Sequence, residues 1–155
     1  MELSIFLTTD ECCNIPAVSI MKMDNMPNED QIKNLKNLGS KVYDPLVWEF
    51  GPAIGIKVGF IGEELRSKFY TGKEYARHAT GEAFDLEVKK TGSGVTNADV
   101  FNFIRKNILF DELVWVFGND EEPSSVRVAV CHEGPQRGVV MKSFKNKSGY
   151  KERKY

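Results

Sequence analysis

The sequence of 155 residues has no long apolar run and no recognisable secretion signal at its start. No stretch approaches the ~20 apolar residues that a membrane-spanning helix needs. The opening Met-Glu-Leu-Ser-Ile-Phe-Leu has neither the basic start nor the small-residue cleavage site of a signal peptide. We therefore expect no membrane partner, and a protein that stays in the cytoplasm unless a larger assembly or lysis carries it out.

Cysteine is also scarce. The three thiols leave an odd one after any pairing, which favours reduced cysteines over a disulfide framework. Cys12 and Cys13 are adjacent and could bind a metal, but small buried apolar fillers are the commoner role for such residues.

The net charge is only −1, but it is unevenly distributed. Residues 142–155 carry about +5, so the rest of the chain carries about −6. Basic segments of this kind bind nucleic acid or acidic protein surfaces, although most are simply solvated. We predict a basic C-terminal tail over 142–155 that packs on a neighbouring protein subunit or on nucleic acid. Its binding residues would be Lys145, Lys147, Lys151, Arg153 and Lys154.

Residues 1–141 are expected to form one domain, because 41% of the chain is hydrophobic and no break in composition divides it. Asn28 and Gln31 have the spacing of a helix capping box and open the main amphipathic helix, which we expect to kink or close near Pro45. Thr96 opens a second helix in the same way. The apolar positions at helical spacing are Ile32, Leu35, Leu38, Val42, Leu46 and Val47, then Val100, Phe101, Ile104 and Ile108.

The remaining segments read as a short helix, several strands and an irregular start. Residues 63–69 are a helix candidate, and residues 1–26 are predicted to be an extended N-terminal arm with a strand-like run from Leu3 to Leu7. Alternating apolar side chains predict strands at 53–60, 82–88, 112–117, 125–131 and 138–141. Helices followed by an antiparallel-looking set of strands indicate an α+β fold, with helices packed on a small antiparallel sheet.

One stretch combines chemically active side chains with a turn and a strand. Phe84, Leu86 and Val88 alternate with Asp85, which therefore leaves the strand on the face opposite the apolar row. Gly81 allows a sharp turn that brings His78 back over that face to meet Asp85. Imidazole and carboxylate are half of a common zinc site, but by spacing alone an ordinary hydrogen-bonded pair is the more frequent outcome.

Several motifs occur in the order found in one enzyme family. His78-Ala-Thr-Gly-Glu-Ala-Phe-Asp85 is flanked by Asn14-Ile-Pro, Met26-Pro27, Asp44-Pro-Leu, Phe110-Asp-Glu-Leu and Gly134-Pro-Gln-Arg-Gly. Over residues 10–142 the chain resembles zinc D-Ala-D-Ala carboxypeptidases, including phage endolysin-like members with the Hedgehog/DD-peptidase fold. The resemblance implies that His78 and Asp85 stand at zinc-ligand positions.

The rest of the family's site is altered in this chain. The third zinc ligand of the family is a histidine, and the matching position holds Arg127, whose protonated guanidinium has no lone pair to give. The general base would fall at Val116 or Ser124, and Ile61 replaces a substrate-binding arginine. We predict that Arg127 instead hydrogen-bonds Asp85 and occupies the position of the metal. A shifted metal site using Cys131 and His132 is left open.

These losses lead to three hypotheses about function. The first is a non-enzymatic structural or binding subunit on a degenerate peptidase fold, with no catalytic residues and no cofactor. It would belong to a bacteriophage virion, reached from the host cytoplasm, with other protein subunits as partners. The alternative is an active zinc-dependent peptidase of cell-wall peptidoglycan. The third is an unrelated small-molecule site in the old groove.

Overall fold

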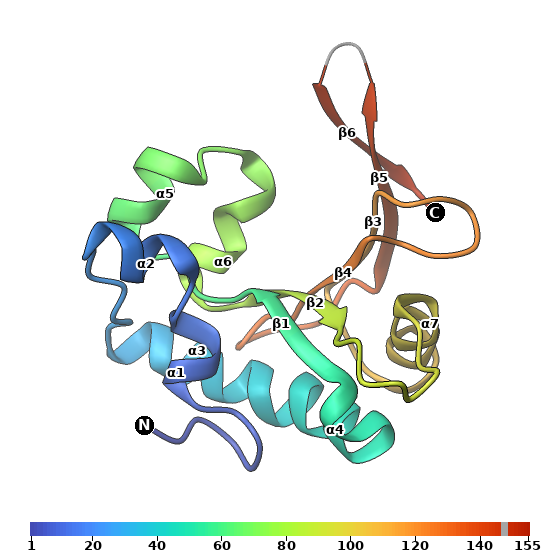
Figure 1. Ribbon diagram of the computed structural model, residues 1–155, viewed down its shortest axis with the longest axis horizontal. Helices are drawn as coiled ribbons and strands as arrows, with labels where there is room; N and C mark the ends of the chain where they lie inside the picture. The colour runs from blue at the N-terminus through green and yellow to red at the C-terminus, as the bar shows by residue number, and fades with distance from the viewer. Residues whose placement is uncertain (147–148) are drawn as a thin grey trace.

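The computed structural model describes residues 1–146 and 149–155, with the side chains of 1–145 and 152–155. The fold is α+β, with helices packed around an open, mostly antiparallel sheet of six strands (Figure 1). The elements are α1 Thr9–Cys13, α2 Pro16–Met21, α3 Glu29–Leu38, α4 Asp44–Phe50, β1 Ile54–Val58, α5 Glu63–Phe69, α6 Ala76–Thr80, β2 Ala83–Val88, α7 Asn97–Asn107, β3 Glu112–Val116, β4 Ser125–Ala129, β5 Val139–Asn146 and β6 Gly149–Lys154. Within the described ranges, no helix has the length and apolar character that crossing a bilayer requires.

The strands lie in the order β1-β2-β4-β3-β5-β6. All neighbours are antiparallel except β3 and β5, which run parallel. Side chains alternate between the two faces of the sheet, and the apolar face packs against helices α3, α4 and α7. The core includes Leu35, Leu38, Leu46, Phe84, Leu86, Phe101, Ile104, Leu113, Trp115, Val126 and Val128. The opposite face carries Asp85, whose register partner on β4 is Arg127.

The main amphipathic helix is divided into two helices joined by a π-helical turn. α3 begins at the Asn28–Gln31 capping box, as predicted, and the chain stays helical through the π turn Gly39–Tyr43 into α4. Pro45 lies in the first turn of α4, where its missing N–H costs least. The predicted irregularity near Pro45 is therefore present, one turn earlier and as a π bulge.

The N-terminal segment has two short helices where an extended arm was expected. Thr8 caps α1 through a capping box with Glu11, and Pro16 is the first residue of α2. The predicted strand over Leu3–Leu7 is instead a turn, closed by the Leu3 N–H donating to the Leu7 carbonyl at 2.8 Å. Helices of five and six residues are too short to show a 3.6-residue period, so periodicity could not find them.

The basic C-terminal segment belongs to the sheet. The strand predicted over 138–141 continues to Asn146, and β6 pairs with it along Met141–Asn146. The resulting β5–β6 hairpin extends beyond the body of the molecule in Figure 1. Lys147 lies outside the described residues. Removing 142–155 would take away five of the eight residues of β5 and all of β6, so such a deletion would disrupt the sheet itself.

We expect Gly81→Ala to lower the free energy of unfolding by about 2 kcal/mol or more. Gly81 has φ +79°, and an added Cβ would lie 2.8 Å from the Gln31 carbonyl oxygen. Gly92→Ala is the matched control, because Gly92 has φ +73° with open space around it and should cost only about 1 kcal/mol of backbone strain. Urea unfolding of the two variants measures the difference, and equal losses would contradict the close contact at Gly81.

Candidate functional site

The predicted pair of His78 and Asp85 is present and buried. Helix α6 ends at Gly81 in the left-handed conformation, which folds His78 back over β2. His78 is fully buried, and its Nε2 lies 3.1 Å from Oδ1 of Asp85. The other ring nitrogen, Nδ1, lies 2.9 Å from the carbonyl oxygen of Gly59. Because a carbonyl oxygen only accepts, Nδ1 carries the hydrogen of that bond.

Arg127 lies on the same carboxylate. Its Nε donates to Oδ1 of Asp85 at 2.8 Å and its Nη2 to Oδ2 at 3.3 Å, which is the two-pronged geometry of strong arginine–carboxylate pairs. Arg127 is 6% exposed and Asp85 4%. Burial alone would raise the pKa of Asp85, but the charges and hydrogen bonds of His78 and Arg127 outweigh it and lower the pKa to about 2. The predicted Arg127–Asp85 contact is therefore confirmed.

Two residues that the sequence reasoning missed complete the cluster. Glu152 on β6 approaches Arg127, with Oε1 3.5 Å from Nη1. The Tyr75 ring lies 5.8 Å from Cζ of Arg127 and 5.8 Å from the ring of His78. Burial raises the pKa of the Tyr75 hydroxyl, and the Asp85 charge raises it further. Neither contact has a local signal in the sequence, since both depend on how distant strands and helices pack.

A cavity of about 270 Å³ opens beside this cluster. Val116 and Ser124, the positions matched to the family's general base, do line it, and neither carries a carboxylate. Glu74 lines it as well and was missed by the sequence reasoning. Ile61, which the resemblance aligns with a substrate-binding arginine, is fully buried in a separate apolar cluster with Leu65.

Cys131 and His132 lie away from the Asp85 cluster and bond other residues. β4 ends at Ala129, so the alternation that would put Cys131 on the Arg127 side stops before it. The Cys131 thiol instead accepts a hydrogen bond from Nη2 of Arg77 at 3.2 Å, and His132 is exposed beside Glu82. Within the part of the chain that the structure describes, no three His, Cys, Asp or Glu side chains gather as a metal-binding group.

The flanking motifs form a separate polar network around Asp111. This buried carboxylate accepts hydrogen bonds from Arg77 at 2.6 Å and from Arg137 at 2.7 Å. Hydrogen bonds from Arg137, and then those of Arg77, hold the pKa of Asp111 far below its usual range despite its burial. The motifs around Phe110 and Gly134 thus join the central stretch through structural ion pairs.

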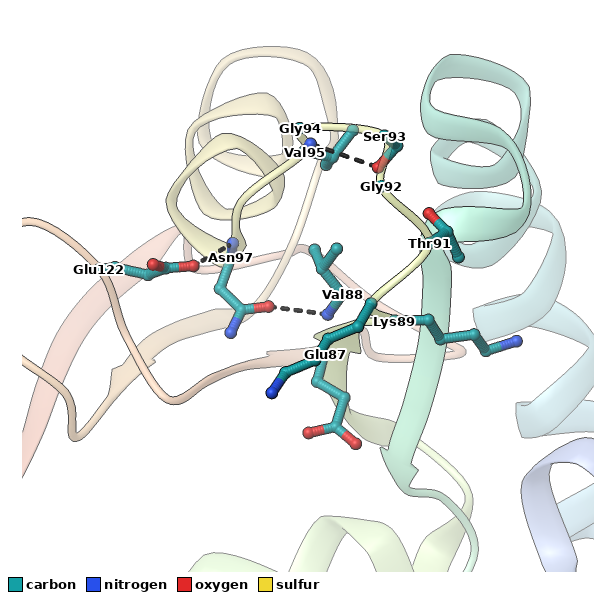
Figure 2. A pocket seen from close by; sticks show the side chains of 11 residues that line it. Glu87, Val88, Lys89, Thr91, Gly92, Ser93, Gly94, Val95, Asn97 and Glu122 are labelled. Carbon is teal, nitrogen blue, oxygen red and sulfur yellow. Dashed lines mark hydrogen bonds between the residues drawn. The ribbon is translucent and has the colours of Figure 1, made fainter.

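The acidic loop before β4 also has a structural role. A depression of about 360 Å³ lies between this loop and the start of α7. Figure 2 shows Glu122 beside Asn97, the first residue of α7, where the Glu122 carboxylate accepts the Asn97 N–H. The Asn97 side chain accepts the Val88 N–H and donates to the carbonyls of Pro123 and Ser124. Glu122 and Asn97 therefore connect β2, α7 and the loop that leads into β4.

Comparisons with protein-family models, with curated proteins and with solved structures found no match for this chain. The resemblance to zinc D-Ala-D-Ala carboxypeptidases stays a prediction from the motifs.

Replacing Arg127 with Met should lower the free energy of unfolding by about 3–5 kcal/mol, because Asp85 would be left as a buried charge without its arginine. The double variant Arg127→Met/Asp85→Asn should recover most of that loss, since the carboxylate is removed together with the guanidinium and the amide can still bond His78. Lys36→Met on the exposed side of α3 is the control and should change stability by less than about 0.5 kcal/mol. Additive losses in the double variant, measured by urea unfolding, would contradict a direct charge pairing.

The lowered pKa of Asp85 should make the stability of the protein depend on pH. Since the pKa of Asp85 falls from an ordinary value of 3.8 to about 2 on folding, its contribution is complete above pH 4 and disappears as the pH falls to 2. The stability advantage of the wild type over Asp85→Asn should therefore shrink by about 2 kcal/mol between pH 5 and pH 2. A difference that stays constant across this range would show that Asp85 is not held ionised.

Proposed function

We propose that this chain is a non-catalytic structural or binding subunit built on a degenerate zinc-peptidase fold of the Hedgehog/DD-peptidase type. The observation that carries the proposal is the two-pronged contact of Arg127 with Asp85 in a buried site. At this position a cationic side chain neutralises the carboxylate that would otherwise hold a metal ion.

The residues at the site do not fit a catalytic zinc ion. Such a site needs three protein ligands and an open position for water, and among the described residues no third His, Cys, Asp or Glu joins His78 and Asp85 as a metal-binding group. Arg127 occupies both oxygens of Asp85 and adds a positive charge where the ion would bind. The orientation of His78 nevertheless supports descent from a metal site, because Nδ1 bonded to a backbone carbonyl with Nε2 facing inward is typical of metal-bound histidines.

The groove also lacks, at the positions matched to the family, a general base and a residue that binds the substrate carboxylate. Val116 and Ser124 cannot take a proton from an attacking water, and Ile61 cannot bind a substrate carboxylate. Each loss of this kind costs orders of magnitude in rate, so together they support a binding or structural role over hydrolysis.

The proposed setting is a bacteriophage particle, with other protein subunits as partners, and it rests on the likeness to phage-type members. The alternative is an active zinc-dependent peptidase that cuts cell-wall peptides. It is supported by the retained His78–Asp85 pair and by Glu74, a carboxylate that lines the adjacent cavity.

Metal analysis and a hydrolysis assay on the purified wild-type protein separate these two functions. We expect less than about one zinc per ten chains after dialysis against zinc, and no cleavage of cell-wall peptides or release of D-amino acids. Stoichiometric zinc together with hydrolysis that is lost on chelation would overturn the proposal and establish the alternative.

Arg127→His provides a complementary test by restoring the third ligand type. We expect this variant to bind zinc with about micromolar affinity or tighter in calorimetry, while the wild type does not. Arg127→Gln is the matched control, because it removes the same charge without adding a zinc ligand. If Arg127→Gln gained zinc equally well, the third-ligand position would not be at residue 127.

A further inference from the structure

The β5–β6 hairpin combines cations with aromatic rings in a way that the sequence alone does not show. Cζ of Arg153 on β6 lies 5.4 Å from the centre of the Phe144 ring on β5. Nζ of Lys145 lies 5.1 Å from the ring of Phe117, which comes from the end of β3. Lys142 on β5 is the register partner of Arg153. The two cation–ring pairs thus join β5, β6 and the residue that directly follows β3.

These side chains line a shallow groove of about 510 Å³ between the hairpin and the loop after β3. We refer to it as the hairpin groove, lined by Phe117, Asp120, Lys142, Phe144, Lys145 and Arg153. Three cations and one carboxylate line it. Lys142 and Arg153 share one face of the hairpin, whereas Lys145 reaches the groove from the other face and also lines the cavity at Asp85. The carboxylate, Asp120, is paired with Lys142 and is almost fully exposed. The groove is therefore positively charged.

Glu152, the acidic residue of the hairpin, points away from the hairpin groove. Glu152 precedes Arg153 in β6, and successive side chains of a strand point to opposite faces. Glu152 lies 3.5 Å from Arg127, toward the buried site. Its charge is thus engaged by Arg127, while Arg153 stays with Phe144 in the hairpin groove.

The backbone at Phe117 is held in a strained conformation. Phe117 has φ +50°, which is rare for a bulky residue, and strain of this kind concentrates at ligand-binding positions. Its N–H donates to the Ser143 carbonyl on β5 at 3.2 Å, so the strained residue is fixed to the hairpin. The next residue, Gly118, has φ +73°, and an added Cβ would lie 2.1 Å from the Glu122 carbonyl oxygen.

We propose that the hairpin groove binds single-stranded nucleic acid. Lys142, Lys145 and Arg153 would contact successive phosphates, and bases would stack on Phe117 and Phe144 beside the cations already placed there. A purely acidic protein surface would need the cations but not the rings. A duplex keeps its bases stacked inside, where these rings cannot reach them. This binding goes beyond the proposed function and does not depend on whether the Asp85 site is catalytically silent.

The test is fluorescence anisotropy with a fluorescein-labelled 20-residue oligothymidylate. At 50 mM salt we expect micromolar binding whose affinity falls with salt, with a log–log slope of about −2 for three phosphate contacts. Lys145→Gln/Arg153→Gln should weaken binding at least about tenfold and reduce the slope to about −0.7. Lys33→Gln/Lys36→Gln on exposed α3 removes the same charge elsewhere and should stay within about twofold of the wild type.

The aromatic contribution is tested by Phe144→Leu, which keeps an apolar side chain but removes the stacking surface. We expect about fivefold or greater loss for the oligonucleotide, with an unchanged circular dichroism spectrum showing that the fold is retained. Wild-type binding should resist competition by polyglutamate and by duplex of equal charge. Absence of binding, equal losses in the α3 control, full affinity in Phe144→Leu or efficient competition by polyglutamate would each overturn the proposal, the last in favour of an acidic protein partner.

Discussion

The negative charge of Asp85 is the constraint around which the sheet is arranged. A carboxylate that is 4% exposed is tolerated only when it is paired and hydrogen-bonded. Here His78 and Arg127 both contact Oδ1, and Arg127 also reaches Oδ2. The antiparallel register of β2 and β4, which sets Asp85 opposite Arg127, is what makes this compensation possible.

Arg127 also connects this buried charge to the edge of the molecule. One side of its guanidinium lies on Asp85 in the centre of the sheet, and another approaches Glu152 on the outermost strand. Arg127 thereby helps to orient the β5–β6 hairpin. The buried Asp85 site and the basic hairpin are therefore parts of one electrostatic arrangement.

The features that could be predicted from the sequence are those set by residues close together in the chain. The capping boxes at Asn28 and Thr96 mark the starts of α3 and α7 correctly, because a cap is defined by residues three apart. The meeting of His78 and Asp85 followed from one glycine turn and the two-residue period of a strand. These signals lie within a few residues of one another, so tertiary packing does not obscure them.

What could not be predicted depends on partners distant in the chain. The sheet was expected to be antiparallel, yet β5 runs parallel to β3 with β4 between them in sequence. Cys131 was expected beside Arg127 because the strand was predicted to continue to residue 131, whereas β4 ends at Ala129. Residues 142–155 were predicted to be a basic tail that packs on a partner, whereas most of them form β5 and β6, because their many lysines leave no run of alternating apolar side chains to mark a strand.

β6 is an edge strand of the sheet, and its positively charged residues therefore also affect how the folded molecules associate. An outermost strand offers a row of backbone donors and acceptors to any other polypeptide that approaches, and such rows initiate uncontrolled association of folded molecules. Positive side chains along the strand repel a second identical strand before hydrogen bonds can form. The positive charges of the hairpin thus oppose edge-to-edge association of the folded molecules at high concentration.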